Sequence, residues 1–568
     1  MKNYYGVDIP KQREALRNSA AAAPLIREIM ERAETALTAE YTVDTMSKYM
    51  EYYRTGHRAD TEYFNRRNNA MSLAMALWLT EDEKYRSPLV DVIHIICNEF
   101  TWCIPAHSHM HKEPTVDYVI HKIDLFQAET ARALTEIVIL LDGKLPYYVT
   151  ERIEYELRRR IIEAYLKYSF FVNAEDQLNN WSAVCAGGAA MALLHFGTQE
   201  EIDAILPRLI KGLDRYLEGL TNDGCCQEGV IYWNFGFGNY INFANLLYGW
   251  SEGRIDYIHN QKAVDLALFP QKAKLNRNLT VSFSDAQPEF KCNPGFMCWL
   301  KKTYPGVQLP GLEHGTNFIN SVASITSLLW MDPDYVPAPE QYETTFFPEA
   351  QWYICRKEKF SFAAKGGHNN EPHNHNDLGS FMIAVGNDIP LADLGAPEYV
   401  RYANLDDRFV KLNFSSRGHS VPIINGQYQG LGREYRSEVR EAGENIFSLD
   451  LQGAYPEGLV KRVSRTFRIH NSSVFLKDVF EFMNPADKAT ERFVTWTKPI
   501  LEAGTVDLGT AKIHFDAEKY VAEVSVDHYN AHRIRPNALR EVTVYLIDIT
   551  AKKQCCTEFD FEIKVKPE

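Results

Sequence analysis

Apolar positions in the first part of the chain recur with the spacing of amphipathic helices. Between about residues 11 and 330, one stripe runs through Leu25, Ile29 and Ala33, and another runs through 71–78. Residues three and four apart share one face of an α-helix, so each stripe predicts a helix that buries this face. A succession of such helices with short polar breaks predicts hairpins packed side by side in an arc or ring. Further helices are predicted at 89–100, 117–141, 148–171, 181–195, 200–220 and 238–250.

The pattern changes after a proline-rich stretch at 331–342. Apolar and polar residues then alternate, as in 463–469 and 559–565, which is the period of a strand with one buried face. The expected fold class is therefore multidomain α + β. An N-terminal (α/α) toroid, an incomplete helical barrel, is expected over residues 1–335, and an antiparallel β-sandwich over 345–568, where a small C-terminal sub-domain is left open.

The composition describes a folded protein that does not favour nucleic acid. The chain has 568 residues, a length greater than one hydrophobic core usually organises, and 45% of the residues are apolar. Its formal net charge is −14 and its basic residues are scattered. The one basic run, Arg158–Arg160, lies in a helical pattern and is expected on a solvated face. Nucleic acid is therefore not an expected partner.

The N-terminal sequence lacks the apolar segment of a signal peptide, and no later stretch stays apolar long enough to cross a bilayer. A cytoplasmic protein without a membrane partner is expected, or a secreted or periplasmic one if a leader was removed. The ten cysteines show no metal-ligand spacing and are expected to be mostly reduced thiols. Oligomeric state, including a homo-oligomer, is left open.

A run of polar residues at Gly366–Asp377 is the strongest candidate site. It reads G-G-H-N-N-E-P-H-N-H-N-D and is flanked on both sides by apolar, strand-like residues. His373 and His375 are two apart, so on an extended backbone their imidazoles face the same way. Such a pair can share a metal, or divide metal binding and proton transfer between them.

Glycines and aromatic residues interleave at 223–240, in D-G-C-C-Q-E-G-V-I-Y-W-N-F-G-F-G-N-Y. Aromatic faces bind the apolar faces of sugars, glycine allows close approach of the backbone, and a tyrosine hydroxyl can relay a proton. Tyr232 and Tyr240 are the tyrosines of this cluster. A further element, Asn179-Asn180-Trp181, has the sequence of a helix start, where asparagine is a favoured cap, and its amides are alternatively donors to a substrate carboxylate.

Five motifs in order resemble the heparinase II/III-like polysaccharide lyases, across roughly residues 100–430. They are N-N-W-S-A-V at 179–184, E-G-V-I-Y-W-N-F-G at 228–236, H-N-H-N-D-L-G-S-F at 373–381, L-A-D-L-G-A-P-E-Y at 391–399 and R-G-H-S-V-P-I-I-N-G at 417–426. The resemblance implies a helical toroid followed by a β-sandwich, with the active cleft between them. It also implies cleavage of uronic-acid polysaccharides by β-elimination at C4–O4, which gives unsaturated uronate products.

The resemblance also assigns roles. Elimination takes the C5 proton of a uronate, which requires a donor that neutralises the neighbouring carboxylate. Asn179 and Asn180 match this segment, but several members have histidine at the second position, so which asparagine acts is left open. Tyr232 and His373 match the groups that move protons, with the tyrosine alone acting on one sugar face or His373 as base and Tyr232 as acid on opposite faces. An ordinary tyrosine is a poor base near neutral pH, so the site is expected to favour the phenolate or to couple it to the histidine.

A divalent metal, a structural Zn²⁺, is implied by the match of His375, Asp393 and His419 to ligands in parts of the family. The run His107, His109, His111 is expected in a loop that lines the sugar cleft. Arginines, Arg436 among them, are expected to meet carboxylate or sulfate groups. The residues expected to bind substrate are His107, Trp181, Glu228, Trp233, Tyr240, His368, Arg417 and Arg433.

Glycosaminoglycans (heparin or heparan, chondroitin, hyaluronan) are the favoured substrates because of these arginines. Alginate or oligoalginate is the alternative polymer. A glycoside hydrolase on a toroid fold is the rival chemistry and would need two opposed carboxylic acids. A carbohydrate-binding protein without catalysis is the rival class. The mode of attack, endolytic or exolytic, is left open.

Overall fold

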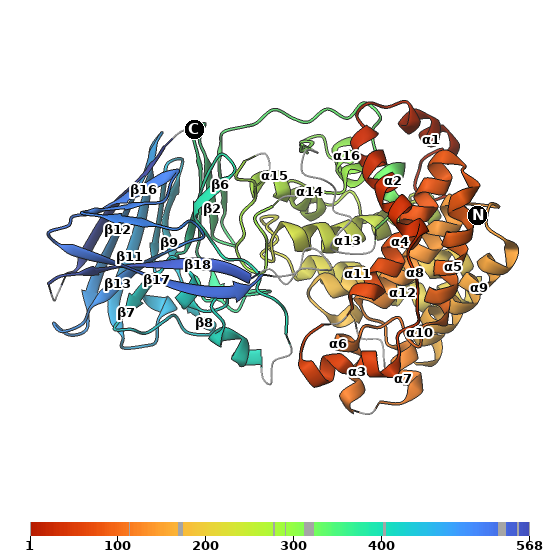
Figure 1. The fold of residues 1–568 in the computed structure, drawn as a ribbon, viewed down its shortest axis with the longest axis horizontal. Helices are drawn as coiled ribbons and strands as arrows, with labels where there is room; N and C mark the ends of the chain where they lie inside the picture. The colour runs from red at the N-terminus through yellow and green to blue at the C-terminus, as the bar shows by residue number, and fades with distance from the viewer. Residues whose placement is uncertain are drawn as a thin grey trace.

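The chain forms a helical half and a sheet half that lie side by side along the long axis of the molecule (Figure 1). The structure is a computed structural model and describes residues 2–566 except 59, 113, 169–173, 277–278, 290, 312–322, 401–404, 532–540 and 554–555. Helices occupy the chain up to residue 329 and the first strand begins at residue 344. The expected fold class is thereby confirmed.

The helical half contains long antiparallel helices and several short ones. Its most central member is α11 (Asn180–Phe196), which is apolar on every side, is buried along nearly its whole length and packs against α8, α12 and α13. The helices are α1 (Ile9–Arg17), α2 (Ala23–Leu37), α3 (Met46–Thr55), α4 (Thr61–Thr80), α5 (Arg86–Asn98), α6 (Pro105–Ser108), α7 (Val116–His121), α8 (Leu125–Leu140), α9 (Tyr147–Leu157), α10 (Glu163–Lys167), α11, α12 (Gln199–Glu218), α13 (Val230–Trp250), α14 (Gln261–Ala267), α15 (Phe269–Lys272), α16 (Pro294–Thr303) and α17 (Thr326–Leu329). Among the described residues, no helix is long and apolar enough to cross a membrane.

Two predicted helices are interrupted. The segment 117–141 divides into α7 and α8 because the Asp124 carboxylate caps α8, accepting a hydrogen bond from the Gln127 N–H at 2.8 Å. A π-helical turn, Arg158–Ile162, separates α9 from α10. The expectation that 158–160 is a solvated run is wrong for Arg160, which is buried, pairs with Glu156 at 2.8 Å and donates to backbone carbonyls.

The sheet half consists of antiparallel sheets that pack face to face. The orders are β1-β2-β3-β5-β6, then β14-β15-β16-β19-β12-β11-β10-β9, then β17-β18-β13-β7, with a small pair β4-β8. The strands are β1 (Thr344–Phe347), β2 (Trp352–Arg356), β3 (Ser361–Lys365), β4 (His368–Asn369), β5 (Phe381–Val385), β6 (Asp388–Leu391), β7 (Pro422–Ile424), β8 (Gly432–Arg436), β9 (Glu438–Gly443), β10 (Ile446–Asp450), β11 (Val460–Ile469), β12 (Ser473–Phe482), β13 (Ala489–Thr495), β14 (Ile500–Glu502), β15 (Thr505–Asp507), β16 (Ala511–His514), β17 (Tyr520–Asn530), β18 (Glu541–Ala551) and β19 (Glu558–Val565).

The five-stranded sheet is a layer shared by two cores. On one face, Tyr353 of β2 stacks on Phe447 of β10 with ring centroids 4.9 Å apart, which joins it to the eight-stranded sheet. On the other face, Trp352 packs edge-on against Phe283 of the helical half at 5.2 Å. Every residue of β2, β3 and β5 is buried. This layer therefore fixes the helical half on the sandwich.

Candidate active site

Tyr232 and His373 come together where the helical half meets the sheet half. Tyr232 lies in the first turn of α13, and His373 lies in the loop that follows β4. Their rings are 4.3 Å apart between centroids, with 32° between the planes. His373 has a φ of 54°, a backbone conformation that residues with a Cβ rarely adopt and that often occurs at functional sites. A phenol and an imidazole from different halves are thus in contact.

The start of α13 is set by Gly229, whose φ is 90°. A Cβ at this position would lie 2.4 Å from the Cβ of Ala286, so only glycine permits this approach. The contact brings the first turn of α13 against the segment that carries Asp285.

Asp285 holds the two histidines and a second tyrosine. Its Oδ2 accepts hydrogen bonds from His373 Nδ1 at 2.6 Å and from the Tyr399 hydroxyl at 2.7 Å, and its Oδ1 accepts from His375 Nε2 at 3.0 Å. The carboxylate is almost fully buried. Burial alone would raise the pKa of Asp285, but the hydrogen bonds from the two imidazoles outweigh it and hold the pKa well below its ordinary value. Asp285 is therefore ionised and orients His373 with Nε2 directed away from it.

Tyr399 connects Tyr232 to this carboxylate. The hydroxyl oxygens of Tyr232 and Tyr399 are 2.6 Å apart, and Tyr399 donates onward to Asp285. Burial, followed by the charge of Asp285, raises the pKa of both tyrosines well above the ordinary value. Of the two expected arrangements, a favoured phenolate is wrong, because burial and the charge of Asp285 oppose it; coupling of Tyr232 to the histidine stays a prediction. Tyr232 keeps its proton and is suited to donate it.

The two asparagines at the start of α11 have different surroundings. The Asn179 side chain caps the helix and accepts a hydrogen bond from the Trp181 N–H at 3.0 Å. The Asn180 amide is buried and donates from Nδ2 to Glu228 Oε2 at 3.3 Å, while no residue in the described part of the chain donates to its Oδ1. Glu228 Oε1 in turn lies 3.5 Å from His373 Nε2. Asn180, rather than Asn179, therefore faces the groups around His373.

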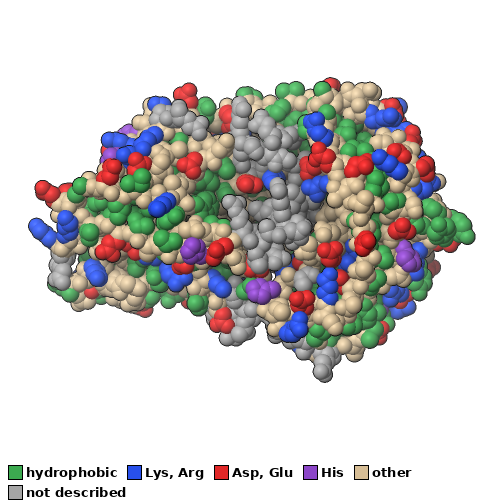
Figure 2. Space-filling model, viewed as in Figure 1, with side chains coloured by type: hydrophobic (Ala, Val, Ile, Leu, Met, Phe, Trp, Pro, Cys, Tyr) green, Lys and Arg blue, Asp and Glu red, His purple; other side chains and the backbone are tan. Residues whose placement is uncertain are grey.

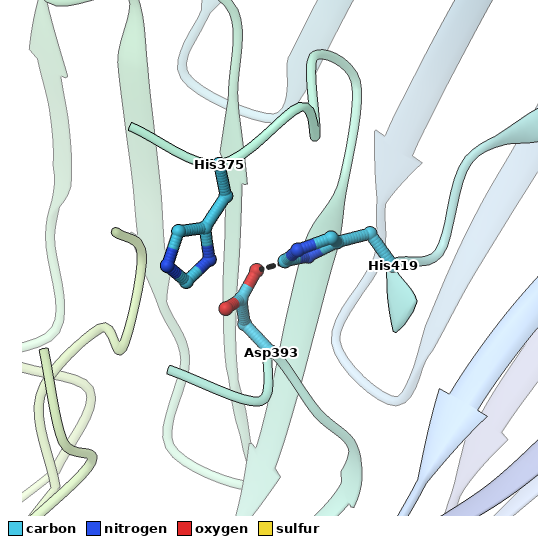
Figure 3. Close-up of side chains that lie close together, drawn as sticks. All are labelled: His375, Asp393 and His419. Carbon is cyan, nitrogen blue, oxygen red and sulfur yellow. Dashed lines mark hydrogen bonds and ion pairs between the residues drawn. The ribbon is translucent and has the colours of Figure 1, made fainter. Parts of the chain in front are cut away.

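His375, Asp393 and His419 point toward one another in the sheet half (Figure 3). All three are buried, and they offer ligand atoms within 4.8 Å of one another. His375 Nε2 donates to Asp285, and its buried Nδ1 has no hydrogen-bond partner among the described residues. His419 Nε2 donates to the Asn413 carbonyl at 2.6 Å, which leaves Nδ1 3.1 Å from Asp393 Oδ2. Two imidazole nitrogens beside a carboxylate, with His419 Nδ1 in hydrogen-bond contact with Asp393, form a donor set that fits a divalent metal.

A buried ionic group adjoins this cluster. Lys365 Nζ lies 2.9 Å from Asp377 Oδ1 and 3.6 Å from Glu371 Oε2. Burial raises the pKa of Glu371 to about 7, although the lysine opposes that effect. This group holds the two ends of the histidine loop, on either side of His373 and His375.

Two predicted substrate-binding residues, Trp233 and Tyr240, lie in the helical core, which corrects that expectation. The Trp233 indole donates to the Leu266 carbonyl and the Tyr240 hydroxyl to the Tyr257 carbonyl, each at 2.7 Å. Both side chains are inaccessible to solvent. The physical reason is helical periodicity, since neighbouring positions in α13 point about 100° apart and only the face with Tyr232 meets the site.

The remaining predicted contacts fall into two groups. His107, in α6, lies with its ring centroid 4.7 Å from that of Trp181 and is oriented by the Asp124 carboxylate, 2.8 Å from its Nδ1. His109 is exposed, and the side chain of His111 lies outside the described residues. The other predicted contacts lie on the sheet half, without a described contact to the His373 cluster. His368 in β4 is half-buried, and Arg433 and Arg436 in β8 are exposed. Arg417, in the turn before β7, lies 3.5 Å from Asp527.

Sequence reasoning missed Asp285 and Tyr399. Asp285 lies in S-F-S-D-A, a segment without a recognisable motif, and is 88 residues from His373. Tyr399 ends the motif L-A-D-L-G-A-P-E-Y, which was the available signal.

Comparisons with known proteins agree with this architecture. Residues 340–545 match the family model described as heparinase II/III-like, C-terminal. No curated protein sequence gives a significant match. Residues 340–545 are thus similar to the C-terminal domain of heparinase II/III-like proteins, and the resemblance seen in the motifs is confirmed.

Several solved structures share the fold of the whole chain. Heparinase III matches with a TM-score of 0.60 and 12% identity, covering 97% of this chain and 92% of that chain. The heparan sulfate lyase HepC of Pedobacter heparinus, as a mutant, matches with a TM-score of 0.58 and 12% identity, covering 96% and 88%. The chondroitin AC lyase of Streptomyces coelicolor A3, in complex with chondroitin sulphate, matches with a TM-score of 0.55 and 9% identity, covering 99% and 83%. At these identities the likeness establishes the fold.

Proposed function

We propose that this protein is a polysaccharide lyase that cleaves glycosaminoglycans beside a uronic acid by β-elimination. The observation that carries the proposal is the meeting of a phenol, a carboxylate-held imidazole and a buried amide at one place, formed by Tyr232, His373 and Asn180. These are the three kinds of group that elimination requires. The structural neighbours include a heparan sulfate lyase and a chondroitin AC lyase, which supports the choice of reaction and of polymer.

His373 acts as the base in this proposal. Its Nδ1–H is held by Asp285, so the lone pair is on Nε2, which takes the C5 proton of the uronate. The same logic orients a catalytic histidine by a buried aspartate in hydrolytic triads. As C5 loses its proton, the C4–C5 double bond forms and the C4–O4 bond breaks.

Tyr232 acts as the acid and gives its proton to the departing O4 oxygen. Its raised pKa keeps it protonated near neutral pH, and Tyr399 connects it to Asp285. Asn180 neutralises the substrate carboxylate, because its amide contacts Glu228, which in turn lies next to the base His373.

His375, Asp393 and His419 would hold a divalent metal, and the mixed nitrogen and oxygen donors favour Zn²⁺. Its contribution would be structural, because it would fix the loop that carries His373. Asp285 would orient His375 toward the metal and His373 toward the sugar through its two oxygens.

The substrate partner is an anionic polysaccharide or oligosaccharide. Acidic and basic side chains are interspersed on the face seen in Figure 2. In this proposal the polymer is therefore selected by local contacts around the site rather than by a surface of one charge.

The test is ultraviolet absorbance of the unsaturated product on a panel of heparan sulfate, chondroitin sulfate, hyaluronan and alginate. We expect wild-type turnover on a glycosaminoglycan and its loss in Tyr232→Phe. Tyr240→Phe is the matched control, since it removes a hydroxyl from the same helix, and this hydroxyl bonds to Tyr257 and Asn260 away from the site. Shortened chains without a double bond would identify a hydrolase and refute the proposal.

A further inference from the structure

Glu228 is a buried carboxylate next to the base and the neutralising amide. It directly precedes Gly229, the cap of α13, and is 5% exposed. Its two oxygens face different groups, Oε2 receiving the Asn180 Nδ2 hydrogen bond at 3.3 Å and Oε1 lying 3.5 Å from His373 Nε2. Glu228 is therefore next to any substrate that contacts both Asn180 and His373.

Among the residues that the structure describes, Glu228 forms an ion pair with His373 and none with a lysine or arginine. Burial lowers the pKa of His373, but the Asp285 hydrogen bond and the charge of Glu228 outweigh this and raise it. Burial raises the pKa of Glu228 and the negative charge of Asp285 adds to this, while His373 and the Asn180 hydrogen bond oppose it. The titratable groups that face Glu228 are His373, Asp285, Tyr232, Tyr216 and Cys226. The last three keep their protons because burial raises the pKa of each.

A uronate that binds the Asn180 amide places a second carboxylate beside Glu228. Two ionised carboxylates that share one amide in a buried site repel each other strongly, and a single shared proton removes the repulsion. A hydrogen bond from a carboxylic acid to a carboxylate is also short and strong.

We infer that Glu228 binds the substrate in its protonated form, donating its O–H to the uronate carboxylate while its other oxygen keeps the Asn180 hydrogen bond. Asn180 and Glu228 together then neutralise that carboxylate before the C5 proton leaves. The proton is taken from solvent when the sugar binds and returns to solvent when the product leaves. This role rests on the proposed lyase function and specifies how it selects a uronic acid.

The role predicts a distinct effect of pH on affinity. Above the pKa of Glu228, binding requires uptake of one proton, so the dissociation constant of the wild type should rise about tenfold per pH unit. Glu228→Gln mimics the protonated acid, since its carbonyl can accept from Asn180 and its amide can donate to the uronate. Its dissociation constant should stay near the lowest wild-type value and remain flat. Glu228→Ala should bind weakly at every pH.

The experiment is calorimetric titration of a uronate-containing glycosaminoglycan hexasaccharide between pH 5.5 and 8.5. A Tyr232→Phe background prevents turnover, and the pH dependence of KM in the active enzyme gives a second readout. The carboxyl-methyl ester of the hexasaccharide is the control ligand, and its affinity should show no steep rise or fall with pH.

The role of Glu228 would be overturned if Glu228→Gln bound the hexasaccharide as weakly as Glu228→Ala. It would also be overturned if the dissociation constant of Glu228→Gln rose with pH as steeply as that of the wild type. The two proposals fail separately. Binding with the predicted slopes but no unsaturated product from the active enzyme would refute the lyase function alone. Normal elimination with a flat wild-type profile would refute the role of Glu228 alone, and absence of uronate binding would refute both.

Discussion

Replacing Asp285 with asparagine keeps the size of the side chain but removes its charge and one of its acceptors. In the native protein Oδ2 accepts from His373 Nδ1 and from Tyr399, and Oδ1 accepts from His375 Nε2. An amide has one accepting atom and one donating atom. Whichever way it is oriented, Asp285→Asn places N–H against N–H or O–H on one side.

The magnitude follows from these bonds. A hydrogen bond to a charged group contributes about 1.5–3 kcal/mol. The two hydrogen bonds that Oδ2 accepts, from His373 and Tyr399, are lost or weakened together. A barrier raised by roughly 3–5 kcal/mol lowers kcat by about 10²–10⁴-fold. The mechanism is a change of tautomer, since His373 with a proton on Nε2 has no lone pair for the C5 hydrogen.

The assay is the rate of ultraviolet absorbance at saturating substrate, with the melting temperature measured alongside. Asp450→Asn is the matched control, because Asp450 is a buried carboxylate of the sheet half that bonds Arg440 away from the site. It should lose stability and keep kcat. A folded Asp285→Asn protein with kcat within about threefold of wild type would refute the assignment of the base.

Three further outcomes are expected. Gly236→Ala should lower kcat/KM, because the new Cβ would lie 2.9 Å from Tyr216 and 3.1 Å from the Asn180 Cβ. The matched change Gly238→Ala, whose Cβ would lie 3.9 Å from Phe296, should keep activity and gain up to about 1 kcal/mol of stability from helix propensity. Equal activity of the two variants would contradict the crowding of Asn180. Removal of bound metal with a strong chelator should lower the melting temperature and release a divalent ion detectable by mass spectrometry, whereas an unchanged melting temperature and no released ion would rule out the structural metal. The pKa of Glu371 is raised to about 7 in the folded state from an ordinary value near 4.5, so ionisation favours the unfolded chain and stability should fall as pH rises between these values. In thermal melts from pH 4 to 8, Glu371→Gln should not show this fall in melting temperature. If the fall persists in the variant, another group causes it.

The type of an element could be predicted from periodicity where it buries a single face, as the helices α2 and α12 and the strands β12 and β19 do. Helix breaks were harder to predict. The division before α8 depends on Asp124 acting as a cap, and the π-turn depends on Arg160 finding buried partners, neither of which changes the apolar period.

The candidate site was only partly predictable. Histidine and tyrosine stood out because a glycine-rich and polar setting has little packing value for them. Asp285 did not, because its importance comes from three contacts made across the chain, the longest joining it to Tyr399, 114 residues away. The prediction that Trp233 binds substrate is wrong because helical periodicity places it on the core face of α13. Trp233, Phe237 and Tyr240 pack along this face, with successive ring centroids 5.7 Å apart.

The doubly covered sheet formed by β1, β2, β3, β5 and β6 has a consequence for any attempt to dissect the molecule. Its side toward the helices carries Trp352 and Phe347, whose rings contact Phe269 of α15. A fragment that ends before β1, or one that starts there, would present an apolar surface to water and aggregate. Neither half can be transplanted as an independent module without redesign of this layer, and swapping in a relative's sandwich would require its inner surface to be exchanged as well.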